Sequence, residues 1–184
     1  MWIQAIRSPV FELPMALDHA HEFERVALPH AANLLRYAMH IYGGTKADAE
    51  DLVQETLLTA WRSFSQFKAG TNCKAWLFRI MINSRYKQFR RASSRPEEPL
   101  VEEERNLSRP ENISRTAEIR IAFAKLSPEH QEVMQLAVVE GFAIREVAEM
   151  LKVPAGTVMS RLSRARAQLR TMLKPVRLSG EEGL

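Results

Sequence analysis

The stretch at residues 74–91, KAWLFRIMINSRYKQFRR, constrains the fold more than any other part of the chain. Its first half is apolar and aromatic, and its second half is basic without an acidic residue. Read as a helix, it places a polar edge beside an apolar one. The polar edge consists of Arg79, Asn83, Tyr86 and Arg90. Such a helix can anchor in a core and present cations, an amide and a ring to a polyanion, although an ordinary amphipathic helix with a solvated basic face is the alternative.

Helical periodicity extends along most of the chain, where alternation of apolar and polar residues is nearly absent. The 184 residues are 46% apolar, which is enough for one domain or two small ones. We therefore predict an all-α protein. The net charge is only +4, yet basic residues crowd residues 79–95 and 161–177. Segregated basic blocks suggest contact with nucleic acid better than the overall charge does.

Several classes of site are disfavoured by composition. The single cysteine, Cys73, excludes an intrachain disulfide and a cysteine-built zinc site. His19 and His21 are close, but no second cluster completes a ligand set, so we expect neither a metal nor another cofactor. No apolar run approaches the ~20 residues of a membrane span, and the N-terminus lacks a signal-peptide pattern. We expect a cytoplasmic protein without membrane insertion and without a small-molecule substrate.

The first half of the chain divides into an extension at residues 1–20 and a helical domain at residues 21–92. The extension lacks a sustained period, so we expect it to be loosely ordered. A helical pattern covers residues 22–42, in which Pro29 implies a kink or a later start. Gly43 and Gly44 end it by permitting a left-handed residue. Thr45 and Asp48 then resemble a capping box that opens a helix at residues 46–63.

One face of that helix is acidic. Asp48, Asp51 and Glu55 share it at helical spacing. Acids in a first turn are favoured by the helix dipole, so N-terminal stabilisation is the simple explanation. Glu55 lies beyond that turn, which is more typical of a docking surface. The next loop, residues 63–72, contains phenylalanines that tuck into a core or hold unstacked bases.

Residues 93–115 are rich in proline, serine and acids, and are predicted to be a flexible linker. Roughly 25 residues reach about 80 Å when extended and nearer 30 Å as a coil. Two DNA half-sites two helical turns apart are separated by about 70 Å. The linker therefore suffices to join two domains that bind such sites.

A second domain is predicted at residues 116–175, followed by a tail at residues 176–184. Its first helix, residues 116–126, turns Ile119, Ala122 and Phe123 inward. Ser127 and Pro128 start another helix, which Gly141 ends. A helix at residues 142–151, a tight turn at residues 152–153 and a long helix opened by Pro154 follow. The inward residues of the long helix are Val158, Leu162, Ala165, Leu169 and Met172.

A short helix, a tight turn and a longer helix with hydroxyls and arginines outside are typical of a helix-turn-helix. In that motif the second helix lies in the DNA major groove. Arginine can bind guanine with two hydrogen bonds, and serine or threonine can bond bases or phosphates. A generic helical hairpin with a basic face is the alternative.

Together these motifs resemble an extracytoplasmic-function (ECF) sigma factor of the bacterial sigma-70 family. DAEDLVQETLLTAW (residues 48–61) and GTNCKAWLFRIMIN (residues 70–83) are similar to that family's region 2, a helical bundle. LSPEHQEVMQLAVVEGFAIREVAEML (residues 126–151) and GTVMSRLSRARAQL (residues 156–169) are similar to its region 4, a helix-turn-helix. The resemblance covers about residues 22–174 and implies promoter recognition, promoter melting and transcription initiation, without catalysis.

The resemblance also implies partners and roles. The residues implied to bind the β′ clamp of core RNA polymerase are Asp48, Asp51, Gln54 and Glu55. Those implied at the minus-ten element are Phe67, Asn72, Trp76, Arg79, Asn83, Tyr86, Lys87 and Arg90. Those implied at the minus-thirty-five element are Thr157, Met159, Ser160, Arg161 and Arg164. The polymerase β subunit and an anti-sigma factor are further implied partners.

Met159 departs from the family pattern, which commonly has lysine or arginine there. A cationic contact is then missing, or an apolar contact to a thymine methyl replaces it. Two other function classes stay open from the residues alone. An autonomous helix-turn-helix regulator explains residues 154–173 but not the acidic helix or residues 76–91. A metal-dependent hydrolase using His19 and His21 lacks a nucleophile–base pair and a ligand cluster.

Overall fold

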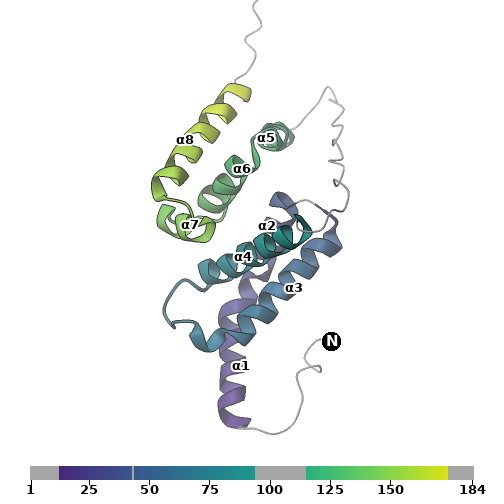
Figure 1. Ribbon diagram of the computed structural model, residues 1–184, viewed down its shortest axis with the longest axis vertical. Coiled ribbons are helices and arrows are strands. Elements are labelled where there is room, and N and C mark those ends of the chain that lie inside the picture. The colour runs from purple at the N-terminus through teal and green to yellow at the C-terminus, as the bar shows by residue number, and fades with distance from the viewer. Residues whose placement is uncertain (1–12, 43, 94–114, 174–184) are drawn as a thin grey trace, which may run out of the picture.

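The computed structural model describes residues 13–42, 44–93 and 115–173, and all regular elements in these ranges are helices (Figure 1). The all-α prediction is confirmed. The helices form two domains, one from α1 to α4 and one from α5 to α8. Most of the expected extension, the linker and the tail fall outside the described residues.

The first domain contains four α-helices and two short 3-10 turns. They are α1 (Leu13–Ala27), η2 (Leu28–His30), α2 (Ala31–Ile41), α3 (Lys46–Arg62), η3 (Phe64–Gln66) and α4 (Cys73–Ser93). Helix α1 begins inside the stretch for which we predicted loose order. The break implied by Pro29 is the 3-10 turn η2, because proline lacks the N–H that would continue the α-helix.

The predicted start of α3 is confirmed. Gly44 adopts φ +82°, and Thr45 caps the helix. The Asp48 N–H donates to Thr45 Oγ1 at 3.2 Å, while Asp48 Oδ2 accepts from the Thr45 N–H at 2.7 Å. These reciprocal bonds satisfy donors that a helix start otherwise leaves free.

Helix α4 supplies much of the core of the first domain. Leu77, Phe78, Met81 and Ile82 have no exposed surface. They pack with α2 and α3, whose fully buried residues include Leu34, Tyr37, Thr56 and Ala60. The rings of Phe78 and Tyr37 meet edge to face, with 5.2 Å between their centroids. The apolar side predicted for α4 is therefore its buried side.

The second domain contains four α-helices and one π-helical segment. They are α5 (Arg115–Ala124), α6 (Pro128–Met134), η4 (Gln135–Val139), α7 (Ile144–Leu151) and α8 (Ala155–Met172). Ser127 Oγ accepts from the His130 N–H at 3.4 Å, so the predicted cap before Pro128 is confirmed. We predicted one regular helix from Pro128 to Gly141, but α6 widens into the π-helical segment η4. Gly141, with φ +76°, ends the helical run as predicted.

For two residues of the second domain, the prediction that they point into the core is wrong. Ile119 in α5 is 46% exposed, and Met172 at the end of α8 is 38% exposed. Both lie at the correct helical spacing, but burial also requires a neighbouring element to cover the residue. Met150 of α7, which we did not predict inside, is buried.

The two domains pack against each other, with α7 on α4 and α6 on α2 (Figure 1). Phe142, just before α7, meets Phe78 of α4 edge to face, with 5.0 Å between ring centroids. The Lys74 ammonium lies 5.0 Å from the centroid of the Phe142 ring. The start of α4 is therefore an interface between the domains.

Candidate nucleic-acid interface

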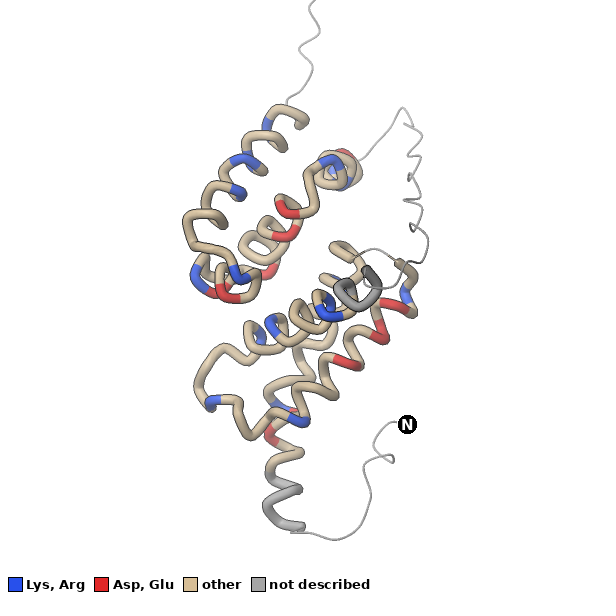
Figure 2. Tube along the Cα trace, in the orientation of Figure 1, with Lys and Arg blue, Asp and Glu red and all other residues tan. Residues whose placement is uncertain are grey.

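Helix α3 carries the acidic surface, defined as Asp48, Asp51, Gln54 and Glu55. Figure 2 shows acidic positions following one another along the N-terminal half of α3. All four side chains are exposed. The Asp48 carboxylate accepts hydrogen bonds from the Thr45 N–H and hydroxyl, as part of the helix cap. These bonds lower the pKa of Asp48. Glu55 Oε2 accepts from Gln88 Nε2 at 2.6 Å, which ties α3 to α4.

The loop between α3 and α4 is held by an aromatic cluster. Phe64 is buried and stacks on Phe67, with 5.8 Å between centroids and 9° between planes. Phe67 also lies 5.1 Å from the Trp76 ring. Phe67 and Trp76 remain half-buried, so each ring keeps an exposed part at the surface. The cluster thus uses the loop phenylalanines for packing and still leaves aromatic surface for a base to stack on.

We call the eight residues implied at the minus-ten element the minus-ten surface. Six of them belong to α4, and most of the surface lies outside the core. Arg79, Tyr86 and Lys87 are exposed, and Asn83 is half-buried. The side chain of Arg90 lies outside the described residues. Asn72 precedes the helix, and its Oδ1 accepts from the Ala75 N–H at 3.1 Å. This bond fixes the asparagine at the first turn of α4.

Two residues near this surface have local structural roles. The Arg85 guanidinium lies 5.5 Å from the centroid of the Tyr42 ring, so this cation packs against its own domain. Cys73 is buried, and burial raises the pKa of its thiol. A protonated, covered thiol is a poor nucleophile, which disfavours a redox role.

Helices α7 and α8 form the predicted helix-turn-helix. Lys152 takes the left-handed conformation, φ 55°, at the end of α7, and Pro154 occupies the position just before the first residue of α8. Val158, Leu162 and Ala165 are buried along α8, and Val147 and Leu151 are buried along α7. This packing determines which side of α8 faces outward.

The minus-thirty-five surface, defined as Thr157, Met159, Ser160, Arg161 and Arg164, lies in the N-terminal half of α8. Met159 is 56% exposed. Ser160 and Arg164 are exposed, and Thr157 and Arg161 are half-buried. The Ser160 hydroxyl donates to the Thr157 main-chain oxygen at 3.0 Å. Packing therefore leaves hydroxyls, arginines and one methionine on the outside of a recognition helix.

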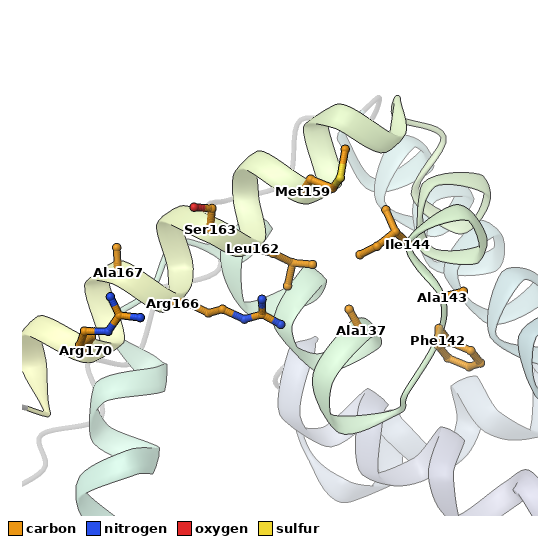
Figure 3. A pocket seen from close by; sticks show the side chains of 10 residues that line it. All are labelled: Ala137, Phe142, Ala143, Ile144, Met159, Leu162, Ser163, Arg166, Ala167 and Arg170. Carbon is orange, nitrogen blue, oxygen red and sulfur yellow. The ribbon is translucent and has the colours of Figure 1, made fainter.

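A hollow of about 580 Å³ lies between α8 and the segment around the start of α7. Figure 3 shows Arg166 and Arg170 on its α8 side and Ala137, Phe142 and Ile144 on the other. Arg166 and Arg170 thus line a different face from the residues of the minus-thirty-five surface, except for Met159, which contributes to both.

Sequence reasoning missed three acidic residues of the second domain that contact the first. Glu132 Oε1 accepts from the Tyr37 hydroxyl at 3.4 Å. Glu140 Oε2 accepts from Asn33 Nδ2 at 3.1 Å, and Glu146 Oε1 accepts from Asn72 Nδ2 at 2.8 Å. The partners lie far apart in the chain, so no local pattern could have indicated these contacts.

These carboxyls differ in how the interface shifts their pKa. Burial raises the pKa of Glu132 above its ordinary value of 4.5, and bonds from Tyr37 and Tyr86 and the nearby Arg161 only partly oppose it. Burial also disfavours ionised Glu140, but bonds from Lys74 and Asn33 outweigh it, so the pKa of Glu140 is lowered. The interface therefore favours a neutral Glu132 and an ionised Glu140.

The raised pKa of Glu132 predicts a pH dependence of stability. Between 4.5 and its higher folded pKa, the native chain binds more protons at this group than the unfolded chain. The contribution of Glu132 is thus fully present below 4.5 and is lost as the pH rises through the folded pKa. We expect the unfolding free energy of Glu132→Gln, relative to the unsubstituted chain, to rise from about pH 4.5 to 7 in urea titrations. A difference that stays constant across this range would contradict the assignment.

The comparisons with known proteins match the two domains separately. The family description Sigma-70 region 2 matches residues 28–95, and Sigma-70, region 4 matches residues 116–169. The ECF RNA polymerase sigma factor SigL of Mycobacterium tuberculosis is 34% identical over 154 residues, 79% of this chain and 85% of SigL. SigM of the same species is 30% identical over 153 residues, 83% of this chain and 78% of SigM.

The chain belongs to the ECF RNA polymerase sigma factors. An ECF sigma factor binds core RNA polymerase and directs promoter recognition and transcription initiation, and it is not an enzyme. The resemblance stated from the residues is confirmed. An autonomous regulator is not supported, because it leaves the region 2 match unexplained.

Solved structures agree with this assignment. The sigma factor RpoE of Bartonella quintana, in complex with the anti-sigma factor NepR, has a TM-score of 0.64 at 29% identity, over 85% of this chain and 99% of RpoE. CnrH, in complex with the cytosolic domain of CnrY, has a TM-score of 0.58 at 27% identity, over 86% of this chain and 93% of CnrH. This ECF sigma factor therefore shares their arrangement of helices.

The structure gives no support to the hydrolase alternative. The His19 ring packs edge to face on Phe64, with 4.8 Å between centroids. Within residues 13–42, 44–93 and 115–173, no group of three or more histidine, cysteine, aspartate or glutamate side chains is placed to hold a metal ion. None of the described helices is long and apolar enough to cross a membrane.

Proposed function

We propose that three surfaces of this ECF sigma factor divide its work between polymerase and promoter. The observation that carries the proposal is the burial of the apolar sides of α3, α4 and α8, which leaves a distinct polar surface on each helix. The acidic surface of α3 docks on the β′ clamp of core RNA polymerase. Its Asp51, Gln54 and Glu55 are exposed, and their position past the first turn exceeds what helix capping requires.

The minus-ten surface captures a promoter strand as it melts. Extruding a base costs a few kcal/mol, which a pocket and stacking offset. The half-exposed rings of Phe67 and Trp76 supply stacking, and Arg79 and Lys87 supply charge for the phosphates. Asn83 and Tyr86 supply hydrogen bonds beside them. Because phosphate contacts release counterions, binding weakens steeply as the salt concentration rises.

The minus-thirty-five surface reads duplex DNA in the major groove. Arg161 and Arg164 can bond guanine or phosphate, and Thr157 and Ser160 can bond bases or phosphates. Met159 is exposed enough to contact a thymine methyl. The proposal assigns the first domain to residues 21–92 and the second to residues 116–175, joined by the linker at residues 93–115.

We expect Arg164→Ala to weaken upstream promoter binding by about 1–3 kcal/mol, since a bidentate arginine–base pair contributes that much discrimination. The measurement is holoenzyme binding to a promoter duplex, with footprinting of the upstream element. Arg166→Ala is the matched control, because Arg166 is an exposed arginine of the same helix that lines the hollow instead (Figure 3). Equal losses of binding affinity in the two variants would show that Arg164 does not read a base of the upstream element.

An anti-sigma factor is proposed as the regulator of this chain, and the cytoplasm as the place where it acts. The support is the likeness to RpoE, which was solved in complex with the anti-sigma factor NepR. Such a regulator should block transcription when it is added before core polymerase and lose effect when it is added after. A protein that binds the chain but whose effect does not depend on the order of addition does not compete with core polymerase, and it is not the proposed regulator.

The function is tested by mixing the chain with core RNA polymerase and mapping transcript starts on genomic templates. We expect new starts that share spaced minus-ten and minus-thirty-five elements and that need the chain. A chain that binds DNA but neither binds core polymerase nor starts transcripts would be an autonomous regulator, contrary to the proposal.

A further inference from the structure

The hollow on the second domain has an apolar wall and a basic wall (Figure 3). Phe142 and Ile144 belong to the apolar wall, and α8 contributes Arg166 and Arg170 to the basic one. The volume of about 580 Å³ lies in the range of sites that take ligands. In the part of the chain that the structure describes, neither arginine forms an ion pair. The hollow therefore suits an occupant that carries both apolar side chains and carboxylates.

The tail, residues 176–184, has this combination of side chains. Its sequence is VRLSGEEGL, in which Val176 and Leu178 are apolar and Glu181 and Glu182 are acidic. Carboxylates form charge-assisted and often bidentate hydrogen bonds with arginine. Gly180 stands between the apolar and the acidic residues and permits a tight turn there. The tail thus matches both walls of the hollow.

The tail is also attached close to the hollow. Helix α8 ends at Met172, two residues after Arg170 of the basic wall. Glu181 follows Met172 by nine residues, which span up to about 30 Å. The part of α8 between Met159 and Met172 is about 20 Å long. A tail that turns back along α8 therefore reaches every part of the hollow.

Attachment to α8 makes weak contacts sufficient for docking. A segment joined to its site by a short connection has an effective concentration in the millimolar range. Exposed ion pairs are weak when two separate molecules must meet, but here the tail is already beside its partners. Pro175 disfavours continuation of the helix, because its N–H is missing. The chain can therefore change direction directly after α8.

We propose that the tail folds back into the hollow and acts as an internal ligand of the second domain. Its apolar side chains cover the apolar wall, and its glutamates pair with Arg166 and Arg170. The docked tail neutralises two arginines of α8 that lie outside the minus-thirty-five surface. Phosphate contacts supply affinity without sequence information, so neutralising these arginines lowers non-specific binding to DNA. This consequence for DNA rests on the proposed function, whereas the docking itself does not.

Docking is tested by disulfide formation between the tail and α8 in the full chain. Leu178→Cys is combined with Ala167→Cys in a Cys73→Ala background, because Ala167 is exposed and lines the hollow. The matched control combines Leu178→Cys with Gln168→Cys. Gln168 is the next residue of α8 and is also exposed, but it does not line the hollow. The reactivity of each cysteine toward a small thiol reagent corrects for differences in accessibility.

At low salt we expect the Ala167→Cys pair to form at least about fivefold faster than the Gln168→Cys pair, because docking raises the effective concentration on one side of α8. Arg166→Gln with Arg170→Gln should remove most of this preference. Arg120→Gln with Arg145→Gln makes the same charge change at exposed arginines of α5 and α7 and should preserve it. Equal rates for the two pairs would overturn the docking. Faster reaction of Ala167→Cys with Leu100→Cys of the linker than with Leu178→Cys would also overturn it.

The consequence for DNA is measured as affinity for a duplex without promoter elements. Glu181→Gln with Glu182→Gln should raise this affinity by about twofold or more, because two phosphate-binding arginines are released. The gain should disappear when Arg166 and Arg170 are also replaced by glutamine. An equal gain in both backgrounds would contradict the proposal, since the tail would then repel DNA without docking. A holoenzyme that starts no transcripts would instead overturn the proposed function, while the cross-linking rates still report the docking.

Discussion

Replacing Asp51 and Glu55 together by arginine should abolish binding of this ECF sigma factor to core RNA polymerase while the chain stays folded. Both side chains are exposed on α3, so their reversal disturbs no buried contact. The bond from Gln88 to Glu55 is also exposed, and its loss has little effect on stability. At a charge-complementary interface, like charges placed opposite one another cost several kcal/mol, which corresponds to a loss of about a hundredfold or more.

The measurement is the affinity of the purified chain for core polymerase, with helix content and unfolding followed in parallel. Glu22→Arg with Glu24→Arg is the matched control, because it makes the same charge change at exposed acids of α1 in the same domain. The docking role is refuted when the α3 double variant binds core polymerase as tightly as the α1 double variant.

Truncating Phe78 to alanine should lower the unfolding free energy of the first domain by about 3–5 kcal/mol. The ring has no exposed surface and makes edge-to-face contacts with Tyr37 of its own domain and Phe142 of the other. Its removal leaves a cavity in the core of α2, α3 and α4 and also deletes the ring contact between the domains. Urea titration followed by circular dichroism measures the loss.

Leu58→Ala provides the comparison, since Leu58 is 52% exposed on α3 and should change stability by no more than about 0.5 kcal/mol. A loss below about 1 kcal/mol for Phe78→Ala would mean that the site collapses around the missing ring and that the packing is looser than the burial indicates.

Helix starts and ends were predictable wherever their causes lie within a few residues. The Thr45–Asp48 cap, the Ser127 cap before Pro128 and the turn at Gly141 all appear where the sequence indicates them. The break at Pro29 follows from the missing N–H of proline. The buried side of α4 follows from helical spacing. In the candidate site, the same spacing correctly kept Arg79 and Arg164 outside the core.

Burial of residues with core spacing was less predictable than the helices themselves. Ile119 and Met172 have the spacing of core residues, yet both are exposed. Periodicity identifies the side of a helix but does not say how far a neighbouring helix extends over it. The widening of α6 into η4 likewise has no signal that we read in its sequence.

The sequence by itself determined the helices, their order, the ECF sigma-factor family and the polar residues that each surface offers. These depend on interactions between near neighbours and on motifs of contiguous residues. Only the tertiary structure decided how the two domains meet. Glu140 contacts Asn33, 107 positions away, and Lys74, 66 positions away, so these pairs exist only once the helices are placed in space. A charge whose partner lies in another domain leaves no local pattern, and for that reason the acids through which the second domain contacts the first could not be foreseen.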